Sequence, residues 1–210
     1  MAPEDTKAPF LRIPWIARQI TKPNVVCAAP NCRTPKADLE DSLLAETLKT
    51  PRTVRSSIYF YTRPPDSQDH IPEVSIVMTM GDGMNGHPDT LHGGITAMMI
   101  DEGCGIYQNV NREREHLLRV KRGLAEGELP PGGESSYTGE LKVRYERPIR
   151  TPGAVVVRAR RVKREGRKEW ILAEVRQAVG GGEDEDGEEV VCARGEALFI
   201  VPRGGGKIKL

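Results

Sequence analysis

Apolar and polar residues alternate along the second half of the chain. Within 137–147, Leu141, Val143 and Tyr145 occupy every second position, and charged residues stand between them. Successive side chains of a strand point to opposite faces of a sheet, so this pattern predicts a strand with one apolar face. Similar runs predict three further strands, at 154–163, 170–179 and 190–201. Short turns join them, so the four strands are expected to pair antiparallel.

The first half of the chain predicts two strands and two helices. Strands are expected at 54–63, where the residues alternate, and at 74–80. Leucines at helical spacing predict a helix of roughly three turns over 38–48. After a turn-rich stretch at 81–89, an apolar helix is expected to run to about Gln108.

This order of elements predicts an α+β fold. The chain would run through two strands, one central helix and then four antiparallel strands. A sheet with one apolar face must cover that face, and the central helix is the only long apolar element available. We therefore expect a curled antiparallel β-sheet wrapped around one central α-helix.

One domain is expected, over 37–203. Prolines recur in residues 1–36, where the periodicity is weak, which predicts an extended arm that is dispensable for folding. Between Thr6 and Ala37 there are bases but no acid, so a mitochondrial targeting segment stays open as an alternative. Residues 111–136 are charged and predict an insertion on the domain, and 204–210 predict a tail.

Composition narrows the class of protein. Lys and Arg total 31 and Asp and Glu total 30, a net charge of +1, which argues against a nucleic-acid-binding surface. No apolar run approaches the ~20 residues that a membrane span needs. The four cysteines (Cys27, Cys32, Cys104 and Cys192) form no Cys-x-x-Cys pair. They predict free thiols in a reducing compartment, the cytoplasm with the mitochondrion as alternative.

Most standard catalytic motifs are missing from the sequence. It contains neither a Gly-x-Ser-x-Gly elbow, nor a Walker loop, nor a dinucleotide fingerprint. Its four histidines do not fall at zinc-ligand spacing with acids or cysteines. We therefore expect neither a metal nor a cofactor.

The start of the central helix is the best candidate for a reactive site. His92, Gly93 and Gly94 open this helix, and Asp101 and Glu102 follow inside it. Unsatisfied N–H groups at a helix start lie at the positive end of the dipole and suit a developing oxyanion. A carboxylate at 101, among apolar neighbours, must be paired, exposed in a cleft or used in catalysis. The alternatives are a plain helix-start turn, a packed histidine and two surface acids.

These residues also carry a resemblance. The segment Leu91-His92-Gly93-Gly94-Ile95-Thr96-Ala97-Met98-Met99-Ile100-Asp101-Glu102 resembles the signature of hotdog-fold acyl-CoA thioesterases of the PaaI-like, thioesterase-superfamily group. The strand and turn at 141–149 resemble the same family, as do the turn at 165–168 and the strand end at 197–200. The resemblance covers roughly residues 40–110 and 137–202. It implies the hotdog fold.

The resemblance also implies roles for single residues. Asp101 would be the general base or nucleophile. The Gly93 N–H would polarise the thioester carbonyl, with Gly94 in support and His92 beside them. Thr138 would help to position water. Asn85 matches the family's asparagine before the histidine, although it lies one residue further from His92 than usual.

The implied reaction is hydrolysis of an acyl-CoA or a related acyl thioester to a free acid and a thiol. In this family catalytic residues of two subunits meet, so we expect a homodimer or homotetramer. Arg144, Arg147 and Arg167 are candidate partners for the phosphates of CoA. Two other functions stay open. One is an acyl dehydratase or hydratase of the same fold, and the other is a non-catalytic acyl-CoA-binding protein.

Overall fold

A computed structural model describes residues 3–127, 136–180, 182 and 186–203. Seven antiparallel strands form the main sheet, in the order β1-β2-β3-β7-β8-β9-β6. Their bounds are β1 Val25–Ala28, β2 Val54–Thr62, β3 Glu73–Met80, β6 Tyr137–Tyr145, β7 Gly153–Glu165, β8 Lys168–Ala178 and β9 Glu189–Ile200. A small hairpin of β4 (Asn85–His87) and β5 (Thr90–Leu91) stands apart from this sheet.

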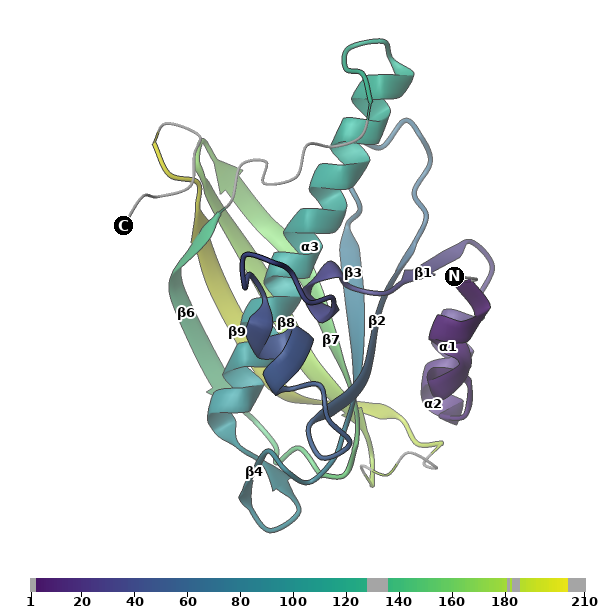
Figure 1. Ribbon diagram of the computed structural model, residues 1–210, viewed down its shortest axis with the longest axis vertical. Coiled ribbons are helices and arrows are strands. Elements are labelled where there is room, and N and C mark those ends of the chain that lie inside the picture. The colour runs from purple at the N-terminus through teal and green to yellow at the C-terminus, as the bar shows by residue number, and fades with distance from the viewer. Residues whose placement is uncertain (1–2, 128–135, 181, 183–185, 204–210) are drawn as a thin grey trace.

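One long helix lies along the inner face of the sheet. This helix, α3, runs from Gly93 to Lys121, and Figure 1 shows the strands curving behind it. Helix and sheet approach closely: a Cβ at Gly103 would lie 2.7 Å from Cγ1 of Val157, and a side chain at Gly195 would overlap Ile100. The predicted α+β fold, a curled antiparallel sheet around one central helix, is therefore confirmed. All six predicted strands are present.

The central helix is longer than predicted. It continues past Gln108 to Lys121, through the first part of the expected insertion at 111–136. The added turns are held from the side, because the Arg114 guanidinium donates to the carbonyls of Pro65 and Gln68. Residues 128–135 of the expected insertion, and the expected tail at 204–210, lie outside the described residues.

The helix predicted over 38–48 is wrong. Only a short π-helical turn, η2, forms there, at Leu43–Thr47. Leu39 and Asp41 have φ angles of 64° and 63°, which an α-helix does not tolerate. The carbonyls of this segment bond to a side chain instead: buried Arg33, in the 3₁₀ turn η1 (Asn31–Arg33), donates to the carbonyl of Leu44 at 2.7 Å.

Residues 3–36 are not an extended arm. They form helices α1 (Pro3–Leu11) and α2 (Pro14–Ile20) and the edge strand β1. Five apolar side chains from this segment pack on the outer face of β2, β3 and β7, and all are at most 2% exposed: Phe10, Ile13, Trp15, Ile16 and Ile20. The outer face is apolar there, with Ile58, Val77 and Val156 fully buried beneath the helices. The expectation of few core contacts is therefore wrong, because this part of the sheet has two apolar faces to cover.

The four cysteines are free thiols, as predicted, and three of them are buried. Within the described residues, no helix is both long enough and apolar enough to cross a membrane.

Candidate functional site

His92 forms the N-cap of α3. Its backbone is extended, and its side-chain Nδ1 accepts a hydrogen bond from the N–H of Gly94 at 2.9 Å. An N-cap side chain satisfies one of the orphan donors of the first turn in this way. The cap is itself anchored, because the His92 N–H donates to the carbonyl of Met84 at 2.9 Å. His92 is exposed, so it is not a packed core histidine.

The cap leaves one of the two predicted glycine donors available. The N–H of Gly94 is occupied by His92, which corrects the expectation that Gly94 supports an oxyanion. The carbonyl of His92 accepts from the N–H groups of Ile95 and Thr96 at 3.0 and 3.1 Å. Among the described residues no acceptor is found for the Gly93 N–H. One helix-start donor therefore remains free for a ligand.

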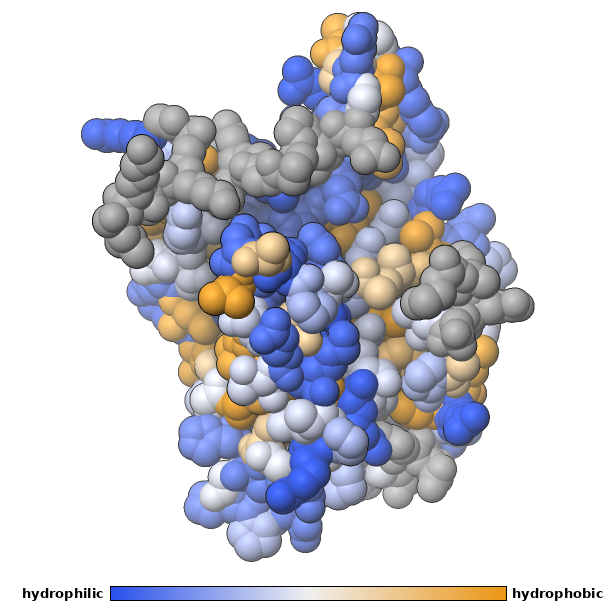
Figure 2. All heavy atoms as spheres, in the orientation of Figure 1, coloured by the Kyte–Doolittle hydropathy of each residue, from blue (hydrophilic) through white to orange (hydrophobic). Residues whose placement is uncertain are grey.

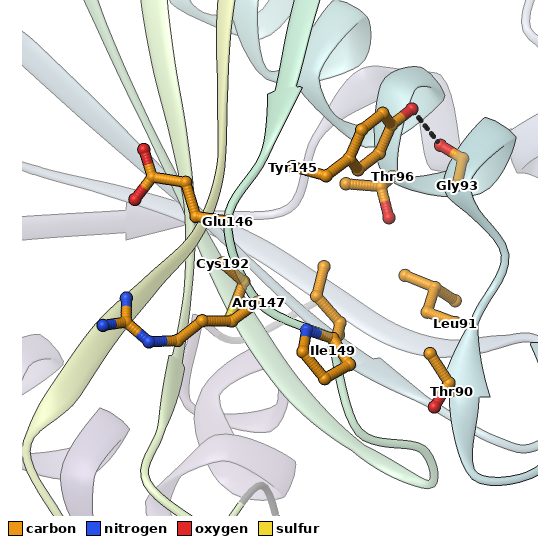
Figure 3. Close-up of a pocket in the computed structure, with 10 residues that line it drawn as sticks. Thr90, Leu91, Gly93, Thr96, Tyr145, Glu146, Arg147, Ile149 and Cys192 are labelled. Atoms are coloured by element: carbon orange, nitrogen blue, oxygen red, sulfur yellow. Dashed lines mark hydrogen bonds between the residues drawn. The ribbon is translucent and has the colours of Figure 1, made fainter.

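A cavity of about 320 Å³ opens beside this donor. Figure 3 shows Gly93 and Thr96 from α3 on one side and Tyr145 at the end of β6 facing them. The Tyr145 hydroxyl donates to the Gly93 carbonyl at 2.9 Å. The remaining lining is mostly apolar and comes from Thr90, Leu91, Glu146, Arg147, Pro148, Ile149 and Cys192.

The structure brings Asp101 and Thr138 together. The Thr138 hydroxyl, near the start of β6, donates to Oδ1 of Asp101 at 2.7 Å. Asp101 is partly exposed, so a small ligand can reach its other oxygen. Gly93 and Asp101 are eight residues apart on one helix, about 12 Å along its axis. The free donor therefore lines the cavity, whereas the carboxylate, which does not line it, stands about two turns further along α3.

Glu102 is not a surface acid. The segment with η1 and η2 covers it, and the Cys32 thiol hydrogen-bonds to its carboxyl group. Burial raises the pKa of Glu102, and the charges of Asp41 and Asp101 add to this effect. Figure 1 shows this covering segment in front of α3, and Figure 2 shows that its outer side is mostly hydrophilic. Sequence reasoning missed the contact, because no local pattern joins Cys32 to Glu102.

Asn85 holds a turn instead of facing Asp101. Its side-chain oxygen accepts a short hydrogen bond from the Thr151 hydroxyl, in the turn before β7. Asn85 itself lies on β4, opposite Leu91 of β5. Its neighbour Gly86 lies close to the ring of His92, so the β4–β5 hairpin supports the capping histidine. Asn85 is therefore a support for the loops around the cavity.

The three arginines expected at the phosphates do not lie together. Arg147 lines the cavity, where its Nη1 donates to the carbonyl of Val191 at 2.9 Å. Arg144 lies opposite Arg194 on β9, whereas Arg167 donates to the carbonyl of Val201 just past the end of β9. Seven residues of strand separate those two places, about 23 Å. Arg147 is the one of the three that lines the cavity, but Figure 3 shows its guanidinium pointing away from Gly93.

The comparisons with known proteins give structural matches alone. No protein-family model and no curated protein matches the chain. Zebrafish thioesterase superfamily member 2 matches with a TM-score of 0.45 and 14% identity, over 63% of this chain and 77% of that one. The PaaI protein of the E. coli phenylacetic acid degradation operon gives 0.44 and 11%, over 64% and 75%. A Bacillus halodurans protein solved with CoA gives 0.43 and 25%, over 62% and 68%.

Proposed function

We propose that this protein hydrolyses an acyl-CoA, or a related acyl thioester, to a free acid and a thiol. The observation that carries the proposal is the hydrogen bond between the Thr138 hydroxyl and the Asp101 carboxylate. It fixes one carboxylate oxygen and leaves the other for a water molecule. A thioester has a good leaving group, so one activated water and one oxyanion site suffice.

Asp101 acts on the water. Its free oxygen takes a proton as the water oxygen bonds to the thioester carbon, and Thr138 keeps the carboxylate in place. The tetrahedral oxyanion accepts a hydrogen bond from a Gly93 N–H. When the intermediate collapses, the C–S bond breaks and the sulfur leaves as a thiol with the proton that Asp101 held. Direct attack by the Asp101 carboxylate on the carbonyl is the alternative route, with water then cleaving the anhydride.

Two copies of the chain complete the site. Within one chain the Gly93 N–H and Asp101 are about 12 Å apart along α3, too far for both to act on one carbonyl. Two helices packed antiparallel would bring Gly93 of one copy to Asp101 of the other. Strand β6 lies beside α3 at the open edge of the sheet, and two of its tyrosines are exposed, Tyr137 and Tyr145. We therefore infer a homodimer as the catalytic unit.

The phosphates of CoA lie at the far end of its pantetheine arm from the thioester, so an arginine that binds them need not lie beside the Gly93 N–H. The Arg147 guanidinium donates to the Val191 carbonyl and points away from Gly93. Arg144, Arg147 and Arg167 therefore all stay candidate partners for the phosphates.

The test measures thiol release from a panel of acyl-CoAs that spans short, long and aromatic acyl groups. Wild-type protein is compared with Asp101→Asn and with the matched control Asp82→Asn, which changes an exposed turn carboxylate. We expect turnover that Asp101→Asn lowers by about 10²–10⁴-fold and Asp82→Asn leaves unchanged. Binding of acyl-CoA without turnover would instead identify a binding protein. Turnover that survives in Asp101→Asn would exclude this base.

A further inference from the structure

The peptide unit that joins Gly93 to Gly94 is hydrogen-bonded at both ends. Its N–H, which belongs to Gly94, donates to Nδ1 of His92 at 2.9 Å. Its carbonyl, which belongs to Gly93, accepts from the Tyr145 hydroxyl at 2.9 Å. The two partners come from opposite sides, one from the cap of α3 and one from the end of β6. Figure 3 draws the second of these bonds, between two residues that line the cavity.

The free Gly93 N–H belongs to the preceding peptide unit, the one that joins His92 to Gly93. A backbone N–H can turn only with its own peptide plane, and the plane of the Gly93 N–H ends at the Gly93 Cα. Glycine has the widest choice of backbone angles, so two glycines in succession make this turn pliable. The plane that carries the Gly93 N–H also carries the His92 carbonyl, which accepts from the N–H groups of Ile95 and Thr96. Fixing the neighbouring plane as well, between Gly93 and Gly94, limits the rotation at the Gly93 Cα that would re-aim the Gly93 N–H.

Tyr145 is well placed to hold this turn. Its ring atoms Cε1 and Cζ would lie 3.5 Å from a Cβ at position 93, which is ordinary van der Waals contact. The residue is 55% exposed, so packing alone does not hold it. Its backbone is secured by pairing with Ala193 on β9. Its hydroxyl makes the one side-chain hydrogen bond found between β6 and the first turn of α3 among the described residues.

We propose that Tyr145 is a positioning residue that aims the Gly93 N–H at the thioester oxygen. This inference rests on the proposed thioesterase activity, to which it adds a residue. Tyr145 acts through the Gly93–Gly94 peptide, jointly with the His92 cap. Because oxyanion stabilisation is realised in the transition state, loss of the hydroxyl lowers kcat and leaves KM unchanged.

The decisive variant is Tyr145→Phe, which removes one oxygen and keeps the ring. Its matched control is Tyr61→Phe, a partly buried tyrosine that stacks on Tyr59 in β2, five strands away from β6 in the sheet. We expect Tyr145→Phe to lower kcat roughly three- to tenfold, the ratio that one neutral hydrogen bond is worth. Tyr61→Phe should match wild type. A raised KM with unchanged kcat, or equal effects in both variants, would overturn the proposal.

The His92 cap supplies a second comparison. Asparagine is a good N-cap residue, so His92→Asn should retain activity that His92→Ala loses. Because both side chains hold one peptide, adding Tyr145→Phe to His92→Ala should cost less than the product of the two single effects. Independent, multiplicative effects would mean that the two residues do not share a target.

A measurement without substrate separates this inference from the proposed activity. In protein labelled with ¹⁵N-glycine, the amide of Gly94 should exchange with solvent faster in Tyr145→Phe than in wild type or Tyr61→Phe. If the wild type releases no thiol from any acyl-CoA, the proposed function fails, and the exchange rate still decides whether Tyr145 fixes this turn. Unchanged Gly94 exchange in Tyr145→Phe would overturn the positioning role.

Discussion

The hydroxyl of Thr138 donates to Oδ1 of Asp101 at 2.7 Å, joining the start of β6 to the middle of α3. Two further bonds join the same two elements or their ends: Tyr145 to Gly93, and Ser136 to Gln108 at 2.8 Å. All three are made by side chains, because a strand that runs beside a helix has no backbone ladder to share with it. The attachment of β6 to α3 at the candidate site therefore depends on a few polar side chains.

Removing the Thr138 hydroxyl should weaken catalysis less than removing the base. Thr138→Val keeps the shape of the side chain but frees the Asp101 carboxylate to rotate. We expect kcat to fall by about tenfold, against 10²–10⁴-fold for Asp101→Asn. Steady-state thiol release measures both, with circular dichroism as the control for folding. Equal losses in the two variants would mean that Thr138 does more than orient Asp101.

Replacing Gly93 by alanine should separate folding from catalysis. An added Cβ would meet only Tyr145, at an ordinary contact distance of 3.5 Å, so the helix should form and its thermal stability should not fall. Alanine is also a better helix former than glycine by about 1 kcal/mol. The methyl group would crowd the approach of a carbonyl to the N–H, and kcat/KM should drop. Full activity with normal stability would show that no ligand approaches the Gly93 N–H.

Helices α1 and α2, which pack on the outer face of the sheet, should be essential for stability. Ile16 on α2 is fully buried, so Ile16→Ala should cost about 3 kcal/mol of unfolding free energy. Leu11, 48% exposed, provides the control, and Leu11→Ala should cost well under 1 kcal/mol. Urea denaturation measures both. Equal, small losses in the two variants would instead support the sequence-based prediction that residues 1–36 are dispensable for folding.

The buried Glu102 carboxyl should make stability depend on pH. Its pKa is raised by burial above the ordinary 4.5, so the folded state holds this proton more tightly than the unfolded state. The stability that the protonated carboxyl contributes is present at and below pH ~4.5 and is lost as pH rises through the folded pKa. Glu102→Gln removes the titration. The stability of this variant relative to wild type should therefore increase from pH 4.5 to 7, as urea midpoints would show. A stability difference between Glu102→Gln and wild type that does not change with pH would contradict the raised pKa of Glu102.

The strands were predictable because their signal is local. The alternation of Leu141, Val143 and Tyr145 places these side chains on the inner face of β6, as expected. The outer helices were missed although they also leave a signal. Phe10, Ile13, Ile16 and Ile20 recur at helical spacing, and Pro14 stands at the first position of α2, where proline is tolerated. The prediction of an extended arm took the prolines as helix breakers and gave this helical spacing no weight.

The candidate site likewise contains residues that the sequence could reveal and contacts that it could not. Asp101 and the glycines stand in one continuous segment, and the resemblance of that segment to a known family brought in Thr138. The pairs Cys32 with Glu102 and Asn85 with Thr151 join residues that are 70 and 66 positions apart. Only the folded chain brings such residues together, so no pattern in the sequence could reveal what their side chains do.

The main sheet has two very different edges. β6 offers nine residues at one edge, whereas β1 at the other has four, flanked by Pro23 and Pro30. Proline cannot donate to a growing ladder, and a short strand gives a poor template. In the proposed dimer, two copies joined through β6 would pair their long edges with each other and leave only the short β1 edges exposed. The sheet would then not extend beyond two copies, and further edge-to-edge association into a fibre would be blocked.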